Sequence, residues 1–268
     1  MIFGVPALDY FSGTTWHFER YKSLVMDIWP EGESGKRSSF LQYKGNRAGG
    51  IFHGQGEQNG RTSYYVQVDG AAADDNRVAL CNSQLQVKRV DIQFTLPREE
   101  WFNSLQVHDD MLLGVWPSSK RQIRAILNEG DDTIYIGDRT HDRFIRIYVK
   151  ERDFVRFELE LKEERAVNAM KFIASGGVSA MAGILIAEIG KLPNSELTNF
   201  YRERLFEMTD VAINLTVPKR RPDQMKRLKW LSSLLPTIER MMMDSDYGDI
   251  VTGWFVDLVD KKLNKGQL

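Results

Sequence analysis

Polar and apolar residues alternate in two neighbouring segments near the middle of the chain. The alternation runs through residues 145–150 and again through residues 155–161. A period of two predicts strands with one buried side. Residues 151–153 suit a hairpin link, which would merge the two polar sides into one surface. That surface would carry Arg146, Tyr148, Lys150, Arg156, Glu158 and Glu160.

A third alternating run extends from Val87 to Leu96 and ends before Pro97. Its apolar side holds Val90, Ile92, Phe94 and Leu96, and its polar side holds Arg89, Asp91, Gln93 and Thr95. Weaker patterns predict strands at residues 7–18 and 63–69. Helical patterns are found at residues 19–28, 98–113, 120–128, 163–174, 178–189 and 196–208, and again from residue 222 onward.

The order of these elements indicates the fold class. Strands dominate the first part of the chain and helices the last, which predicts an α+β protein. We expect a central antiparallel sheet with helices packed on one face and a helical C-terminal part. The expected division is a sheet-based domain at residues 1–215 and a helical extension at residues 216–268 that packs on it. The apolar run 178–189 is too short to cross a bilayer and predicts a core helix.

Composition narrows the class of protein. The net charge of −1 excludes a uniformly basic coat, so any nucleic-acid contact must come from local clusters of Lys and Arg. A single cysteine, Cys81, excludes an intramolecular disulfide framework and a cysteine-rich zinc site. It fits a reducing compartment, and the N-terminus lacks a basic signal-peptide region. These features predict a cytoplasmic protein without a membrane partner.

Two carboxylates on the predicted polar faces are candidate metal ligands. Asp91 and Glu158 could hold Mg²⁺ or Mn²⁺, which prefer carboxylate and water oxygens. The alternative is that they form ion pairs with Arg89, Arg146 or Arg156, because structural ion pairs often resemble sites.

Two tyrosines are candidate nucleophiles. Tyr201 lies on a predicted helix close to Arg202 and Arg204, and Tyr148 lies on the polar sheet face. A tyrosine can attack as a covalent nucleophile when a metal or base assists its deprotonation. Both could instead be ordinary packing residues with a hydrogen-bonded hydroxyl.

Basic residues gather in two clusters that could track a phosphate backbone. The first surrounds the predicted hairpin and contains Arg139, Arg143, Arg146, Lys150 and Arg156. The second precedes and enters a C-terminal helix and contains Arg220, Arg221, Lys226 and Arg227. Acidic neighbours such as Asp138 and Asp142 partly neutralise the first cluster, so the second is the more basic patch.

An ordered set of segments resembles the replication initiation factor family, the rolling-circle initiators of plasmids and filamentous phages, and related relaxases. Residues 135–150, YIGDRTHDRFIRIYVK, are similar to the family pattern YxGSRxSxxxxRIYDK, and residues 156–166, RFELELKEERA, to RxElelk..rA. Residues 7–11, ALDYF, resemble the family's first strand, and residues 87–96 resemble its RxDlaxD strand. Residues 226–241 resemble its C-terminal helix.

The resemblance implies a metal-dependent endonuclease that nicks one strand at a replication origin presented as single-stranded or hairpin DNA. A tyrosine would form a 5′-phosphotyrosine and leave a free 3′-OH. By position, Asp91 and Glu158 would bind the metal, and Tyr201 would be the nucleophile. The arginines that would contact phosphate are Arg139, Arg146 and Arg156. The resemblance also raises a host helicase and a homodimer as partners.

Two departures from the family pattern support a second hypothesis. Thr95 stands where the family strand often has a second aspartate, and Val149 replaces the acidic or amide residue of the YDK pattern. Fewer acidic side chains would weaken metal binding. The sequence therefore leaves open a non-catalytic DNA-binding regulator or assembly factor on the same scaffold, and a protein-interaction domain that uses the apolar stripe of the C-terminal helix.

Overall fold

The computed structural model describes residues 4–28, 38–42, 49–58, 60–98, 123–126, 132–192, 194–216, 240 and 253. The chain divides into two compact units, Met1–Val217 and Pro218–Leu268. The description below concerns the first unit. The predicted helix at residues 98–113 and nearly all of the predicted C-terminal helices lie outside the described residues. The packing of the C-terminal part on the sheet stays a prediction.

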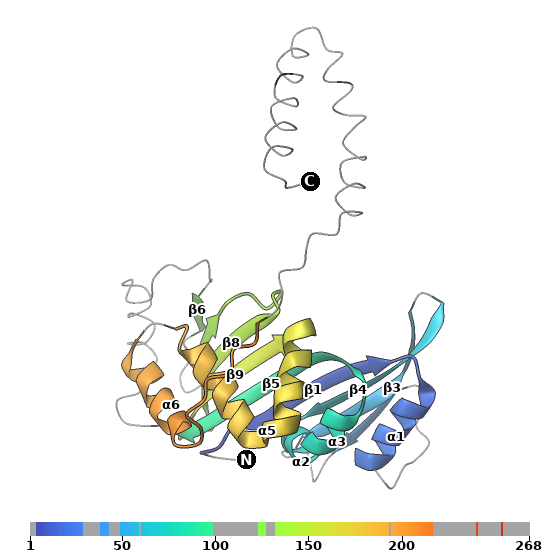
Figure 1. Ribbon diagram of the computed structural model, residues 1–268, viewed down its shortest axis with the longest axis horizontal. Helices are drawn as coiled ribbons and strands as arrows, with labels where there is room; N and C mark the ends of the chain where they lie inside the picture. The colour runs from blue at the N-terminus through green and yellow to red at the C-terminus, as the bar shows by residue number, and fades with distance from the viewer. Residues whose placement is uncertain are drawn as a thin grey trace. The chain divides into compact units, whose positions relative to one another are not determined.

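The described strands form one antiparallel sheet of nine strands, in the order β2-β3-β4-β1-β5-β9-β8-β7-β6 (Figure 1). Their bounds are β1 (Ala7–Thr15), β2 (Ser38–Gln42), β3 (Gly50–Gln58), β4 (Arg61–Asp69), β5 (Gln86–Pro97), β6 (Ile123–Ile126), β7 (Thr133–Ile136), β8 (Arg143–Lys150) and β9 (Phe154–Lys162). The predicted central antiparallel sheet is confirmed. Strand β5 pairs with both β1 and β9, so the sheet joins the N-terminal strand to the central hairpin.

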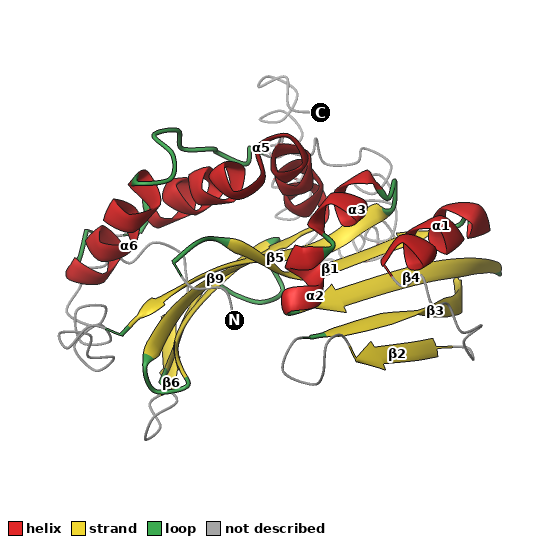
Figure 2. Ribbon diagram, turned by 90° about the horizontal axis from the view of Figure 1, so that it is seen from below, coloured by secondary structure: helices red, strands yellow, loops and turns green. Residues whose placement is uncertain are grey.

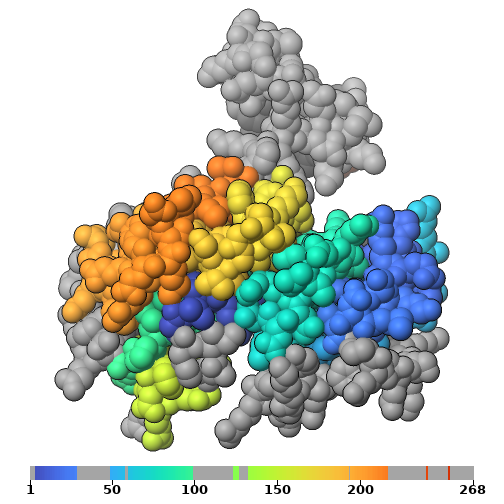
Figure 3. Space-filling model, turned by 60° about the horizontal axis from the view of Figure 1, so that its bottom comes forward, coloured from blue at the N-terminus to red at the C-terminus, as the bar shows by residue number. Residues whose placement is uncertain are grey.

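The helices cover one face of this sheet, as the α+β prediction required (Figure 2). They are α1 (Phe18–Ile28), α2 (Ala71–Asp75), α3 (Arg77–Asn82), α5 (Glu163–Ile189) and α6 (Glu196–Phe206). In Figure 3 the segments of α1, α3, α5 and α6 lie side by side across that face. No described helix lies on the opposite face in Figure 2. We call that opposite side the helix-free face.

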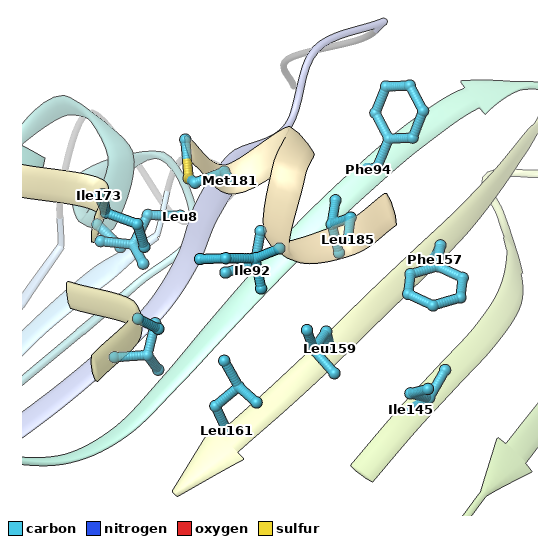
Figure 4. Close-up of a cluster of buried hydrophobic side chains, with 14 of the residues drawn as sticks. Leu8, Ile92, Phe94, Ile145, Phe157, Leu159, Leu161, Ile173, Met181 and Leu185 are labelled. Carbon is cyan, nitrogen blue, oxygen red and sulfur yellow. The ribbon is translucent and has the colours of Figure 1, made fainter. Parts of the chain in front are cut away.

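The apolar sides of the alternating strands form the core beneath α5. On β9 the side chains of Phe157, Leu159 and Leu161 are buried, and on β8 those of Ile145 and Ile147 are buried. Figure 4 shows Ile145, Phe157, Leu159 and Leu161 on the side of the sheet that carries Met181 and Leu185 of α5. Each such side chain contributes about 1.5–3 kcal/mol on burial. The alternation therefore decides which face of each strand receives the helices.

Helix α5 consists of two helical segments joined at Gly177, and they correspond to the helical patterns at residues 163–174 and 178–189. Gly177 has φ 53° and ψ −127°, a conformation that is strongly disfavoured for residues other than glycine. By length and composition α5 alone among the described helices could cross a membrane, but 61% of its apolar window is buried inside the protein. Burial against β5, β9 and α3 accounts for that apolar character.

Two local predictions differ from the structure. The helix expected at residues 120–128 is wrong, because Ile123–Ile126 forms strand β6 at the end of the sheet, paired with β7. The pairing of Ile123 with Ile136 supplies hydrogen bonds that local helical propensity does not outweigh. Helices α2 and α3 were not predicted, since each is only one or two turns long.

An extended segment after α6 lies across α5 at a close approach. The Ile213 amide donates to the Gly183 carbonyl oxygen of α5 at 2.8 Å. Arg165 Nη1 donates to the Leu215 carbonyl oxygen at 2.6 Å. A Cβ atom at position 183 would lie 2.5 Å from the Val211 carbonyl oxygen. Glycine at position 183 therefore permits this crossing.

Replacing Gly183 with alanine should displace the extended segment and lower the free energy of unfolding by about 1–3 kcal/mol. Urea unfolding of Gly183→Ala measures this change. Gly56→Ala is the matched control, because a Cβ at position 56 meets nothing within 4 Å. Equal free energies of unfolding for the two variants would show that the close approach at Gly183 does not contribute to stability.

Candidate functional site

Polar side chains of β5, β8 and β9 converge on the helix-free face. In the strand register Gln93 lies opposite Glu158, and Thr95 lies opposite Arg156. On the other side of β9, Arg146 lies opposite Glu158, and Tyr148 lies opposite Arg156. We call the resulting group the polar cluster, and it consists of Asp9, Arg89, Asp91, Thr95, Arg146, Tyr148, Lys150, Arg156, Glu158 and Glu160. The predicted merging of the two hairpin strands into one polar surface is confirmed, and the pairing of β5 with β9 adds the polar side of residues 87–96 to it.

Two guanidinium groups bridge the buried carboxylates of the polar cluster. Arg89 Nε donates to Asp91 Oδ1 at 2.7 Å, and Arg89 Nη2 lies 2.9 Å from Glu160 Oε2. Arg146 Nη2 donates to Asp91 Oδ2 at 3.3 Å and also to Glu158 Oε1. The ion pairs weighed against metal binding are therefore present for Arg89 and Arg146. The carboxylates are 1–3% exposed, so these pairs are buried rather than solvated.

Burial sets the protonation behaviour of these carboxylates. It raises the pKa of Glu158 to about 7, against the lowering effect of Arg146, and the nearby charges of Asp9 and Asp91 raise it further. Burial also raises the pKa of Asp91, although Arg89 opposes the shift. Glu158 therefore changes its charge near neutral pH.

Tyr148 is the tyrosine that lies beside the carboxylates. Its hydroxyl donates to Glu158 Oε2 at 3.1 Å. Burial and the adjacent Glu158 charge raise the tyrosine pKa above its ordinary value of 10, so the phenol is protonated at neutral pH. The side chain is half-buried, which leaves part of it open to solvent.

Asp9 belongs to the polar cluster, although no alternating pattern predicted this position for it. The β1–β5 pairing has an irregularity between Leu8 and Tyr10, which is where Asp9 stands. Asp9 Oδ1 lies 3.3 Å from Arg156 Nη1. Arg156 Nε donates to Thr95 Oγ1 at 2.8 Å, so Thr95 occupies a place on the helix-free face. Arg156 thus pairs with Asp9 rather than with Asp91 or Glu158.

Tyr201 is separated from the candidate metal ligands by the sheet. Its side chain is 1% exposed and packs against the rings of Phe94 and Phe157, which belong to the core side. Burial raises the pKa of its hydroxyl well above 10, and among the described residues that hydroxyl has no hydrogen-bond partner. The structure therefore does not bring Tyr201 together with Asp91 and Glu158, and the geometry favours Tyr148 of the two tyrosines.

The predicted DNA-contacting residues fall into three groups. Arg146, Lys150 and Arg156 belong to the polar cluster, and Arg139 is 58% exposed, with its Nε 3.5 Å from Glu160 Oε2. Arg143 lies on the helix side instead, where its Nη1 pairs with the buried Glu188 of α5. Its place opposite Leu161 in the register explains this orientation. The others lie outside the described residues: Arg220, Arg221, Lys226 and Arg227.

The two departures from the family pattern fall on opposite faces of the sheet. Val149 is buried in the apolar core and does not face the carboxylates. Thr95 does face the polar cluster, where an aspartate would add a third carboxylate near Arg156. Only the change at Thr95 therefore removes a candidate ligand from the site.

Within the described ranges, no group of three or more His, Cys, Asp or Glu side chains could hold a metal ion. Asp91 and Glu158 do converge, because both contact the Arg146 Nη2 atom. The oxygen donors fit Mg²⁺ or Mn²⁺ in kind, and the guanidinium stands between them. Metal and Arg146 would therefore compete for the same two carboxylates.

Removing the Arg146 guanidinium should destabilise the protein in a pH-dependent way. The folded-state pKa of Glu158, about 7, exceeds its ordinary value of 4.5, so the carboxyl group is protonated at pH 5 and charged at pH 8. Arg146→Met should therefore cost about 3 kcal/mol at pH 8 and less at pH 5, as measured by urea unfolding. Arg204→Met breaks only the exposed pair with Glu207 and should cost under about 1 kcal/mol at both pH values. A loss for Arg146→Met that is the same at both pH values would contradict this account.

Comparisons with known proteins identify the fold. No protein-family model and no curated protein matches the sequence. Among solved structures, the chain is similar to a rolling circle replication initiator protein from Geobacillus stearothermophilus, with 14% sequence identity and a TM-score of 0.53. The likeness covers 80% of this chain and 99% of that one. The chain therefore has the fold of a rolling-circle replication initiator, in agreement with the resemblance of its motifs.

Proposed function

We propose that this protein is a DNA-binding rolling-circle replication initiator that nicks and rejoins one DNA strand. The observation that carries the proposal is the hydrogen bond from the Tyr148 hydroxyl to Glu158, beside Asp91 and three arginines. These groups lie on the helix-free face of a sheet with the initiator fold. A nucleophile, a proton acceptor and cationic phosphate ligands are thus within one cluster.

In the proposed reaction the Tyr148 hydroxyl oxygen attacks the scissile phosphorus. A bond forms between tyrosine oxygen and phosphorus, and the bond from phosphorus to the 3′ oxygen breaks. The tyrosine proton passes toward Glu158, the carboxylate that already accepts its hydrogen bond at 3.1 Å. The 3′ oxygen takes up a proton and leaves as a free hydroxyl. Rejoining reverses these steps.

The cations of the polar cluster would bind the phosphate. Arg156 lies opposite Tyr148 in the register and is held by Asp9 and Thr95. It is only 4% exposed, so the half-buried Arg146 would make the more direct phosphate contact. Lys150 lies on the same strand face, and burial lowers its pKa, so a phosphate charge beside it would favour its ammonium form. Positive charge placed before the reaction stabilises the added charge on the phosphate oxygens in the transition state.

Asp91 and Glu158 would hold Mg²⁺ or Mn²⁺, with Arg146 displaced from between them. A bound divalent ion supplies Lewis-acid polarisation of the phosphate oxygens. A host helicase and a homodimer are further parts of the proposal and rest on the family resemblance. A cytoplasmic location is also proposed, and it rests on the single cysteine Cys81 and the lack of a basic signal-peptide region.

Nicking of supercoiled origin DNA with Mn²⁺ or Mg²⁺ tests the proposal. Tyr148→Phe should lower the nicking rate by about 1,000-fold or more and abolish the covalent protein–DNA adduct, because the attacking oxygen is gone. Gel electrophoresis of the DNA and of the adduct measures both effects. An adduct that forms at the normal rate with Tyr148→Phe would remove this residue from the role.

Tyr201→Phe is the matched control for the same assay. It deletes a buried hydroxyl that has no hydrogen-bond partner among the described residues, so the fold should change in stability by no more than about 1 kcal/mol. Nicking and adduct formation should persist at the normal rate. Loss of the adduct in a folded Tyr201→Phe protein would return the nucleophile role to Tyr201.

A second candidate function is a non-catalytic DNA-binding regulator. It is favoured by the guanidinium of Arg146 between Asp91 and Glu158, and by Thr95 in place of a further carboxylate. This function predicts DNA binding that weakens steeply with salt and is unaffected by EDTA. Binding measured by fluorescence anisotropy, together with the absence of nicked product, would support it. Metal-dependent cleavage would exclude it.

A further inference from the structure

The helix-free face has a second half that differs in character from the polar cluster. On β1, β3 and β4 the side chains on this face are half-exposed, whereas most carboxylates of the polar cluster are buried. The half-exposed group carries hydroxyl, amide and aromatic side chains, and the charged residue beside it on β4 is Asp69, which lies opposite Tyr10 and accepts a hydrogen bond from the Gly50 amide. We call the half-exposed group the open strip, and it consists of Tyr10, Ser12, Thr14, Phe52, Tyr65 and Gln67.

Tyr65 on β4 has a ring that small neighbours leave uncovered. In the register it lies between Gly54 of β3 and Thr14 of β1. Glycine presents no side chain to the ring, and a Cβ at the nearby Gly56 would meet nothing within 4 Å. Among the described residues the Tyr65 ring stacks on no other ring. A half-exposed aromatic ring beside glycine on a sheet surface is a platform on which a flat group can stack.

Tyr10 on β1 connects the open strip to the polar cluster. The Arg89 guanidinium lies over its ring, 4.4 Å from the centroid. The same guanidinium pairs with Asp91 and Glu160. A strand of DNA whose phosphate is held by the cationic side chains of the polar cluster would therefore meet Tyr10 next.

The dimensions of the open strip suit several stacked bases. Thr14, the register partner of Tyr65, is four residues from Tyr10 along β1, which is about 13 Å of strand. Bases stack at roughly 3.4 Å, so about four or five of them span this length. Between the two tyrosines, Ser12 lies opposite Gln67 and offers hydroxyl and amide groups to base edges.

We propose that the open strip binds unpaired bases of single-stranded DNA that flank the scissile phosphate, with Tyr65 as the stacking residue and Tyr10, whose ring already carries the Arg89 guanidinium, at the end of the strip nearest the polar cluster. This inference rests on the proposed function for the place of the scissile phosphate. The rings and neutral polar groups explain why bases rather than phosphates are the ligand. Base–aromatic stacking tolerates any sequence, so this strip would contribute affinity for single strands rather than recognition of the origin.

Fluorescence anisotropy with a labelled 12-nucleotide dT oligonucleotide tests the inference on the full chain. Stacking predicts that Tyr65→Ala weakens binding by about 10-fold, whereas Tyr65→Phe binds as the unaltered protein does. An oligonucleotide of the same length with abasic sites at its central positions should bind the unaltered protein about 10-fold more weakly, since its phosphates are unchanged. This second measurement needs no variant and is independent of any folding defect.

Phe206→Ala is the matched control. Phe206 is 46% exposed on α6, on the helix side of the sheet, so its loss should leave oligonucleotide affinity unchanged. Full affinity of Tyr65→Ala, or equal affinity for the abasic oligonucleotide, would overturn the inference. Equal affinity for a duplex of the same sequence, or no binding of single strands at low salt, would also overturn it.

The outcomes separate this inference from the proposed function. If the protein nicks DNA but binds the abasic oligonucleotide as tightly as the intact one, the base-binding role of the open strip is excluded and the proposed nicking function is unaffected. Single-strand affinity that depends on Tyr65 in a protein that never nicks would support the strip and count against the nickase.

Discussion

The burial of carboxylates in the middle of a sheet is the constraint on which the rest of this structure depends. Asp91, Glu158 and Glu160 are almost wholly buried, and an uncompensated charge there would cost several kcal/mol. Arg89 and Arg146 supply the compensation from neighbouring strands. The ion pairs therefore require β5, β9 and β8 to be adjacent and in register, and a slip of one residue would turn the carboxylates toward the core.

The two faces of strand β9 differ in chemical character. Its apolar side meets α5, and its polar side meets the arginines of β5 and β8. Within the part of the chain that the structure describes, the helices cover one face and leave the other free of helices, from the charged groups of β8 to the side chains of β4 (Figure 2). A sheet with one face covered in this way can keep its catalytic and binding groups on rigid strands rather than on loops.

The same carboxylates can serve two partners. An arginine between Asp91 and Glu158 satisfies both charges without a metal, and displacement of that arginine would expose an oxygen site for a hard cation. The raised pKa of Glu158 has the same origin, since burial and nearby carboxylates disfavour its charge. Charge compensation in the folded protein and metal binding in the proposed nicking reaction would therefore be linked through Arg146.

The sequence by itself determined the strand faces, since Ile145, Ile147 and the residues of 87–96 alternate as they are buried. It also determined the break at Gly177, because only local backbone freedom is involved. Tertiary structure decided what depends on pairing between distant segments. Residues Ile123–Ile126 form a strand because they pair with β7, and Arg143 points to the helix side, where it pairs with Glu188. Asp9 reaches the polar cluster because the pairing of β1 with β5 is irregular at this residue. Tertiary structure also placed Tyr201 in the core and Tyr148 beside Glu158, a choice that residue spacing cannot make because it depends on which face each element presents.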